Sequence, residues 1–363
     1  MKNTFGTNIA LTIFGESHGE SVGAVLDGLP AGLPADEERI RTFLTLRRPA
    51  GEISTARRER DDFRIESGVL DGHTTGTPIL IRIPNEDVRS ADYAAMRTVA
   101  RPGHADLTAQ YKYGGFQDAR GGGHFSGRVT AGLVAAGAVL TDALLRKNIR
   151  IGTHIAQIGD VCDRSFGDTE KDIETLCGRS FAVLEEAAGE RMKAAILAAG
   201  SEGDSVGGIL ETAVTGLPGG VGEPWFDSVE SMLSHALFSI PAVKGVAFGA
   251  GFDLTGMRGS CANDPFALRD GRIVTLSNHN GGVNGGITNG MPLVFRTVVK
   301  PTPTIGKQQD TVDFKEMKET TLAAKGRHDP CIVHRARIVQ DSVTALALCD
   351  LLAARYGTEW LAK

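Results

Sequence analysis

The sequence is poor in cysteine and aromatic residues, and it contains no long apolar run. Its five cysteines are scattered without a CxxC pair, so neither a zinc site nor a disulfide framework is indicated, and we expect no metal. The longest apolar stretch, "AGLVAAGAVLTDALL", is shorter than the ~20 residues of a membrane span. The start, "MKNTFGTNIALTIFGE", has no secretory pattern. We therefore expect a cytoplasmic protein with no membrane association.

Positive charge does not predominate either, since the formal net charge is -5. Nucleic acid is therefore not an expected partner. Several common motifs are missing as well. The absence of Walker A, GxGxxG and HExxH patterns removes kinases, Rossmann enzymes and zinc peptidases as ready explanations.

The pattern G-x-S-x-G does occur, with Ser17 at its centre. In a serine hydrolase this serine lies between a strand and a helix, and an earlier strand loop helps to form the oxyanion hole. Here the following residues, "ESVGAVLDGLP", predict a second strand, and no earlier strand loop precedes the motif. We therefore predict a turn that presents His18 between Gly15 and Gly19, and a serine hydrolase is the least favoured class.

The order of the predicted elements is repeated along the 363 residues. Residues 21–34 and 205–221 are both small and β-branched runs that end in Gly-Leu-Pro, and each precedes a helical pattern. Residues 74–83 resemble residues 288–299, and a long helix follows late in each half. We predict a single domain, 1–363, made of two similar intertwined halves at roughly 8–150 and 200–357.

Short links between the predicted strands favour antiparallel pairing over a parallel Rossmann sheet. We therefore expect an α+β fold whose mostly antiparallel sheets are central and are flanked by helices. The segment from Ile151 to Gly200 predicts a strand followed by helices.

Arginine is concentrated in "LRRPAGEISTARRERDDFR". The later arginines of this run are interleaved with Glu59, Asp61 and Asp62, which is typical of a solvated charged loop. Arg47 and Arg48 instead follow a predicted helix directly. Because guanidinium forks suit carboxylates and phosphates, these two favour a small dianionic substrate.

Glycine-rich turns carry further histidine and arginine. The stretch "RPGHADLTAQYKYGGFQDARGGGHFSGR" holds Arg101, His104 and Arg128, and its glycines lead into a predicted helix. A helix N-terminus behind a glycine-rich turn is a common anion site. The second half adds "NHNGGVNGGITNG", "KPTPTIGK" and "KGRHDPCIVHRAR". Together these stretches indicate a pocket for a multiply anionic small molecule and a phosphorylated cofactor, but residue types alone do not choose the reaction.

The strings "FGESHG", "RPGHAD", "KYGG", "RGGGHFSGR", "VKGV", "NHNGGVNGGI", "KPTPTI" and "GRHDPC" resemble the signatures of the chorismate synthase family, in family order. The resemblance implies a β-α-β sandwich with internal pseudo-twofold symmetry and a homotetramer. It also implies a carbon-oxygen lyase that eliminates phosphate from 5-enolpyruvylshikimate 3-phosphate to give chorismate. Reduced FMN is implied as a cofactor although the reaction has no net redox change.

The resemblance also implies roles for individual residues. His18 would assist the departing phosphate, and His104 would protonate the reduced flavin. Asp329 would lie beside the flavin and Ser17. Arginines would surround the substrate, and the first of them would also contact NADP where NADP binds: Arg47, Arg101, Arg128 and Arg335. The implied flavin contacts are His124, Phe125, Ser126, Pro241, Ala242, Gly285, Lys300, Pro301, Thr302, Pro303, Thr304 and Arg327.

This sequence departs from the common family pattern in two places. His124, Phe125 and Ser126 stand where many members have R-S-S, and Glu52 or Ile53 stands where many have a second arginine. No reductase domain is visible, so an external flavin reductase is the expected source of reduced FMN. The competing reading from another class is a non-catalytic flavin- or phosphate-binding module, which would not need both histidines.

Overall fold

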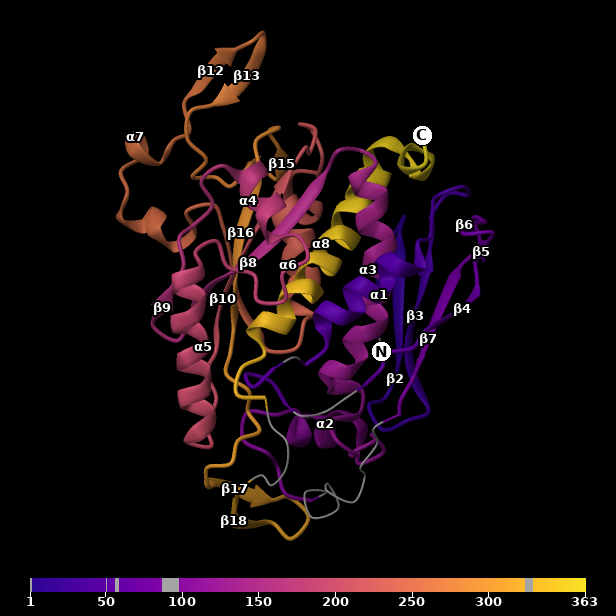
Figure 1. The fold of residues 1–363 in the computed structure, drawn as a ribbon, viewed down its shortest axis with the longest axis vertical. Coiled ribbons are helices and arrows are strands. Elements are labelled where there is room, and N and C mark those ends of the chain that lie inside the picture. The colour runs from indigo at the N-terminus through magenta and orange to yellow at the C-terminus, as the bar shows by residue number, and fades with distance from the viewer. Residues whose placement is uncertain (1, 50, 56–58, 87–97, 324–328) are drawn as a thin grey trace.

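Two five-stranded sheets dominate the computed structural model, which describes residues 2–49, 51–55, 59–86, 98–323 and 329–363 (Figure 1). Every strand pair in these sheets is antiparallel. The first sheet has the order β1 (Thr4–Phe5), β2 (Ala10–Gly15), β3 (Ser21–Asp27), β7 (Ile79–Pro84), β4 (Arg64–Ser67). The second has the order β11 (Val243–Phe248), β16 (Leu293–Val299), β10 (Gly208–Thr215), β8 (Arg150–Ile158), β9 (Val161–Cys162).

Four helices form a layer between the two sheets (Figure 1). They are α1 (Glu37–Arg47), α3 (Thr130–Leu145), α6 (Val229–Phe238) and α8 (Val333–Tyr356). Outside this layer lie α2 (Asp106–Tyr113), α4 (Thr169–Leu176), α5 (Glu186–Ser201) and the short α7 (Gly259–Ala262). Small hairpins complete the fold: β5 (Val69–Leu70) with β6 (His73–Thr74), β12 (Phe266–Arg269) with β13 (Arg272–Thr275), β14 (Val283–Asn284) with β15 (Ile287–Thr288), and β17 (Gln309–Asp313) with β18 (Lys318–Leu322).

The α+β class, the antiparallel pairing and the β-α-β sandwich are confirmed, but the placing of helices outside central sheets is wrong for the main layer. Among the helices of the described residues, α4 and α5 alone pack on the far side of a sheet, against β8, β9 and β10. The physical reason is that α3 and the first five turns of α8 are buried on nearly all sides. A helix that exposes almost no face to solvent has to lie between two layers.

Small residues allow the central helices to approach their neighbours closely. A Cβ on Gly132 of α3 would overlap the backbone of Gly23 in β3, and a Cβ on Gly137 would overlap Ser342 of α8. Residues 127–145, in the described part of the chain, are long and apolar enough to cross a bilayer by composition alone. Here they are mostly buried as a core helix between the sheets.

The two sheets repeat one topology. The order β2-β3-β7-β4 in the first sheet corresponds to β8-β10-β16-β11 in the second. The similarity between residues 21–34 and 205–221 thus corresponds to β3 and β10. The similarity between residues 74–83 and 288–299 corresponds to β7 and β16. Because β8 is the counterpart of β2, the second half of the repeat begins near residue 150, earlier than the expected residue 200.

Candidate active site

A cavity of about 720 Å³ lies where the central helices meet the loops at one end of the sandwich. The first turns of α3 and α8 line it, together with the last residue of α1 and the residues that follow α6. A 3₁₀ turn that is capped by the Ser126 hydroxyl leads directly into α3, and α8 has no side-chain hydrogen bond at its N-cap. Two helix N-termini therefore direct their positive dipole ends toward this space, which favours an anionic ligand.

Most of the residues implied by the family resemblance line this cavity. They are His18, His104 and Asp329; Arg47, Arg128 and Arg335; and His124, Phe125, Ser126, Pro241, Ala242, Lys300, Thr302, Pro303 and Thr304. Pro301, Gly285 and Arg101 do not line it. Gly285 lies in the turn of the β14–β15 hairpin. Arg327 lies outside the described residues.

Ser17 and His18 occupy the turn between β2 and β3, as the sequence predicts, and both side chains are buried. The Ser17 Oγ lies 3.1 Å from Nδ1 of His18, and the Ser17 N–H donates to the Gly123 carbonyl at 3.1 Å. Because a strand follows the serine, the geometry of a nucleophile elbow is absent at this turn. Gly121, with φ of +67°, packs so closely on the imidazole that a Cβ would overlap its ring.

His104 is oriented by a carboxylate that the sequence did not single out. Its Nδ1 lies 3.1 Å from Oδ1 of Asp106, the first residue of α2. Arg101 donates to the same carboxylate from Nε at 2.8 Å and from Nη2 at 2.7 Å. Burial raises the pKa of Asp106, but the hydrogen bonds from Arg101 and His104 outweigh it and hold the pKa far below its usual range. Asp106 is thus a fixed anion behind His104.

Arg101 is implied by the family resemblance as a substrate contact, and in the structure its donors face the protein. Its side chain is buried, and its remaining Nη1 donates to the Gly121 carbonyl at 2.9 Å. All three nitrogens of the guanidinium are therefore engaged within the protein. Arg101 ties the His104 turn to the glycine that packs on His18 and does not itself face the cavity.

Asp61 was interpreted as part of a solvated loop, but its side chain is completely buried. Its carboxylate accepts from Arg47 Nη2 at 2.8 Å and from Arg128 Nη1. Burial raises the pKa of Asp61, but Arg47 and Arg128 overcome this and lower it. Burial lowers the pKa of Arg47 to about 10, and Arg335 and Arg128 act in the same direction. No sequence pattern indicated this cluster, because Arg47 and Arg128 lie 14 and 67 residues from Asp61.

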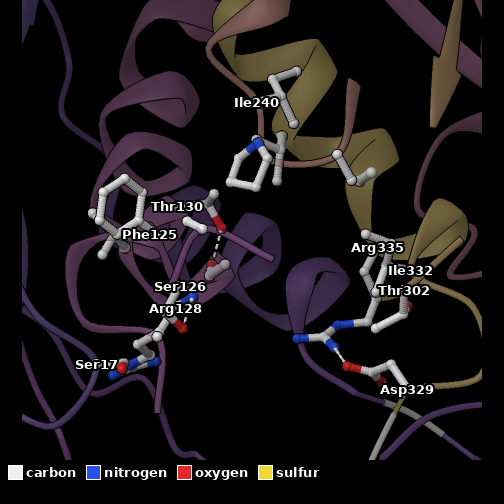
Figure 2. Close-up of a pocket in the computed structure, with 18 of the residues that line it drawn as sticks. Ser17, Phe125, Ser126, Arg128, Thr130, Ile240, Thr302, Asp329, Ile332 and Arg335 are labelled. Carbon is white, nitrogen blue, oxygen red and sulfur yellow. Dashed lines mark hydrogen bonds and ion pairs between the residues drawn. The ribbon is translucent and has the colours of Figure 1, made fainter. Parts of the chain in front are cut away.

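A second ion pair lies on the other side of the cavity. Arg335 donates to Asp329 at 2.7 Å, and Asp329 also accepts the Thr55 N–H at 2.9 Å. Figure 2 shows this pair opposite Ser17 and Arg128. Asp329 therefore lies across the cavity from Ser17, not beside it as expected.

The rest of the wall is largely apolar, and it includes Phe125, Ile240 and Pro241. Phe125 is 40% exposed, which is high for a side chain of this kind. The Thr302 hydroxyl and the Arg47 Nε are buried and lack a hydrogen-bond partner among the described residues. Orphaned buried donors beside an apolar wall fit a ligand with a planar ring and anionic groups, as FMN has. Lys300 connects two parts of this wall, since its Nζ donates to the Gly103 carbonyl at 2.5 Å.

Three imidazoles, three guanidinium groups and an apolar wall thus surround one cavity. The fold and the cavity define an enzyme that acts on a small molecule and is built on an antiparallel β-α-β sandwich. The family model described as chorismate synthase matches residues 9–353. The chain belongs to the chorismate synthase family.

Relatives from distant organisms agree over nearly the whole length. Proteins named chorismate synthase are 44% identical over 358 residues in Thermococcus kodakarensis (99% of each chain), 45% over 353 residues in Korarchaeum cryptofilum (95% of this chain, 96% of the relative), and 47% over 355 residues in Opitutus terrae (96% of each chain). A solved structure titled "Crystal Structure of Chorismate Synthase" superposes with a TM-score of 0.77 at 30% identity, covering 97% of this chain and 94% of that one.

Proposed function

We propose that this protein eliminates phosphate from 5-enolpyruvylshikimate 3-phosphate in a 1,4-anti sense to give chorismate, with reduced FMN in the same cavity. The observation that carries the proposal is the convergence of His18 and His104 on one space with Arg47, Arg128 and Arg335. A non-catalytic binding module would use the cations but would have no need of two imidazoles on separate turns. When bound, reduced FMN supplies electron density to the allylic system as the C3–O bond breaks.

The chain's own residues bind and orient the substrate, and they transfer protons. Guanidinium groups stabilise the negative charge that grows on the departing phosphate, and their effect is larger because the cavity is partly closed to water. His18 donates a proton to the phosphate from a nearly buried position, held by Ser17 and by its packing on Gly121. His104 exchanges its proton at Nε2, because the Asp106 carboxylate accepts a hydrogen bond from Nδ1.

The cofactor would be held by the apolar wall and by the segment from Lys300 to Thr304. Phe125, Pro241 and Ala242 offer flat apolar surface for a ring system. The orphaned Thr302 hydroxyl offers a hydrogen bond to a polar chain or to a phosphate. Of the implied flavin contacts, Gly285 and Pro301 have no part in this proposal because they do not line the cavity.

The test is an anaerobic mixture of the purified protein, reduced FMN and the phosphorylated substrate. Phosphate release that requires reduced flavin supports the proposal. Binding without turnover supports the non-catalytic module, and ester cleavage without flavin supports a hydrolase. His18→Ala and His104→Ala should each lower kcat by about 10²- to 10⁴-fold. The matched control is His73→Ala, because His73 is exposed on the β5–β6 hairpin. Near-normal rates with either active-site variant would remove that histidine from the mechanism.

Four further proposals follow from the family resemblance, each with its own measurement. The protein forms a homotetramer, which light scattering tests. Reduced FMN comes from an external reductase, so NADPH with oxidised FMN should support turnover only when a reductase is added. NADP binds at Arg47, which calorimetric titration tests. The protein is cytoplasmic, which cell fractionation tests.

A further inference from the structure

Asp61 has a backbone conformation that its local sequence does not explain. Its φ of +55° lies in the left-handed region, which non-glycine residues seldom adopt. Asp71 and Asp270 share that conformation, but each is exposed and precedes a glycine in a two-residue hairpin turn. Asp61 is buried and precedes another aspartate. Such a conformation persists only where the surroundings hold it, and at Asp61 the surroundings are arginines of the cavity.

The two arginines that hold Asp61 come from separate elements. Arg47 is the last residue of α1, and Arg128 precedes α3. Two guanidinium groups so placed repel each other unless an anion lies between them. The Asp61 carboxylate provides that anion, with one oxygen toward each partner. Arg48 Nε also lies 3.4 Å from Oδ2 of Asp61, and the buried Glu59 carboxylate lies 4.0 Å from Arg128. Because three guanidinium groups face two carboxylates, the cluster keeps positive charge for a ligand.

Protein contacts engage the two arginines to different degrees. Arg128 also donates from Nε to Asn85 at 2.9 Å and from Nη2 to the Pro84 carbonyl at 3.0 Å. Arg47 donates to Asp61 from Nη2, while its Nε has no hydrogen-bond partner among the described residues. All three nitrogens of Arg128 are therefore engaged within the protein, whereas the Arg47 Nε remains available to the cavity that both side chains line.

We propose that Asp61 is a positioning residue, whose carboxylate sets the separation and orientation of Arg47 and Arg128 for the anionic substrate. The inference rests on the proposed function, because the ligand it names is the phosphorylated substrate. Asp61 does not line the cavity, so its effect on the substrate is transmitted by the two arginines. Its removal should therefore weaken substrate binding, whereas flavin contacts at the apolar wall should be little affected.

The test is Asp61→Asn. Asparagine has nearly the same volume and tolerates the left-handed region, so the substitution removes charge without backbone strain. Calorimetry with 5-enolpyruvylshikimate 3-phosphate, in the absence of turnover, should show a dissociation constant about 10- to 100-fold larger. This is the usual loss of affinity when a hydrogen bond to a charged group is removed. Fluorescence titration with oxidised FMN should change by less than about threefold. The control is Asp62→Asn, because Asp62 is the exposed neighbour.

The outcomes are separable. If the unaltered protein fails to bind the substrate, the proposed function itself is wrong. If it binds and Asp61→Asn binds equally well, the positioning role is wrong. If flavin affinity falls as much as substrate affinity, the role is structural and the proposal is overturned. Should Asp61→Asn not fold, Asp61→Glu retains the charge and displaces the carboxylate. It should then show the same selective loss of substrate affinity, and a failure of both variants to fold would assign Asp61 to stability alone.

Discussion

The carboxylate of Asp106 receives the guanidinium of Arg101 and the imidazole of His104 at the same time. Arg101, which the family resemblance places at the substrate, therefore shares a carboxylate partner with His104. The same guanidinium also donates to the Gly121 carbonyl, so one buried side chain links the turn that carries His104 to the glycine that packs on His18.

Substitution of Arg101 should separate positioning from binding. Arg101→Gln keeps a donor but loses the paired contact with Asp106, so we expect kcat to fall by about 10²-fold while KM for the substrate changes by less than about threefold. Arg335→Gln removes a cation that lines the cavity and should raise KM instead. Steady-state kinetics under anaerobic conditions give both numbers. A large rise in KM for Arg101→Gln would return Arg101 to the set of substrate ligands.

Gly121→Ala should displace the His18 ring, because the added Cβ would overlap the imidazole. We expect at least about a tenfold fall in kcat, since a small misplacement of a reacting group is costly. Gly32→Ala is the control, because Gly32 also has positive φ but has open space around it. Both variants should lose about 1 kcal/mol of stability from the backbone, and only Gly121→Ala should lose activity. Equal activity of the two variants would show that His18 tolerates displacement.

His154 should make stability depend on pH from about 6.5 upward, because 6.5 is the ordinary pKa of histidine. Burial lowers its pKa, but hydrogen bonds from the ring to Asp163 at 3.2 Å and Glu211 at 3.0 Å raise it above 6.5 overall. The stabilisation is thus complete below the unfolded pKa and is lost as pH rises through the folded pKa. Between those values the free energy of unfolding should fall by at most about 1.4 kcal/mol per pH unit.

The measurement is urea denaturation between about pH 6 and pH 7.5, where unfolded cysteines are mostly protonated. His154→Gln should show a flatter dependence on pH than the unaltered protein. His73→Gln, at an exposed histidine, should keep the original slope. Identical slopes for all three proteins would mean that His154 is neutral in the folded state.

Gly137→Ala should destabilise the protein although alanine is the better helix former by about 1 kcal/mol. The added Cβ would overlap Ser342 where α3 packs on α8. We expect a net loss of about 1–3 kcal/mol, typical of an overpacked core. Urea denaturation measures it. Ser342→Gly in the same chain should recover part of the loss, and strict additivity of the two changes would argue against the contact.

The sequence was most informative about local elements and least informative about what lies between them. Period-two runs predicted β3 and β10, and the glycine-rich turn before α3 was found at the cavity. The layer order was missed because composition shows that α3 is apolar, but not that both of its sides face sheets. Asp61 was missed because an aspartate in a charged run has the same pattern whether it is solvated or paired with Arg128, 67 residues away.

The cavity lies where two core helices begin, so a ligand bound in it should raise the stability of the whole sandwich. A ligand that bridges the starts of α3 and α8 holds both outer sheets to the middle layer. At one hundred times its dissociation constant, such a ligand adds about 2.7 kcal/mol to the folded state. Melting temperature is therefore a reporter for this site, and a thermal-shift screen of small dianions would reveal competitors without substrate, flavin or exclusion of oxygen.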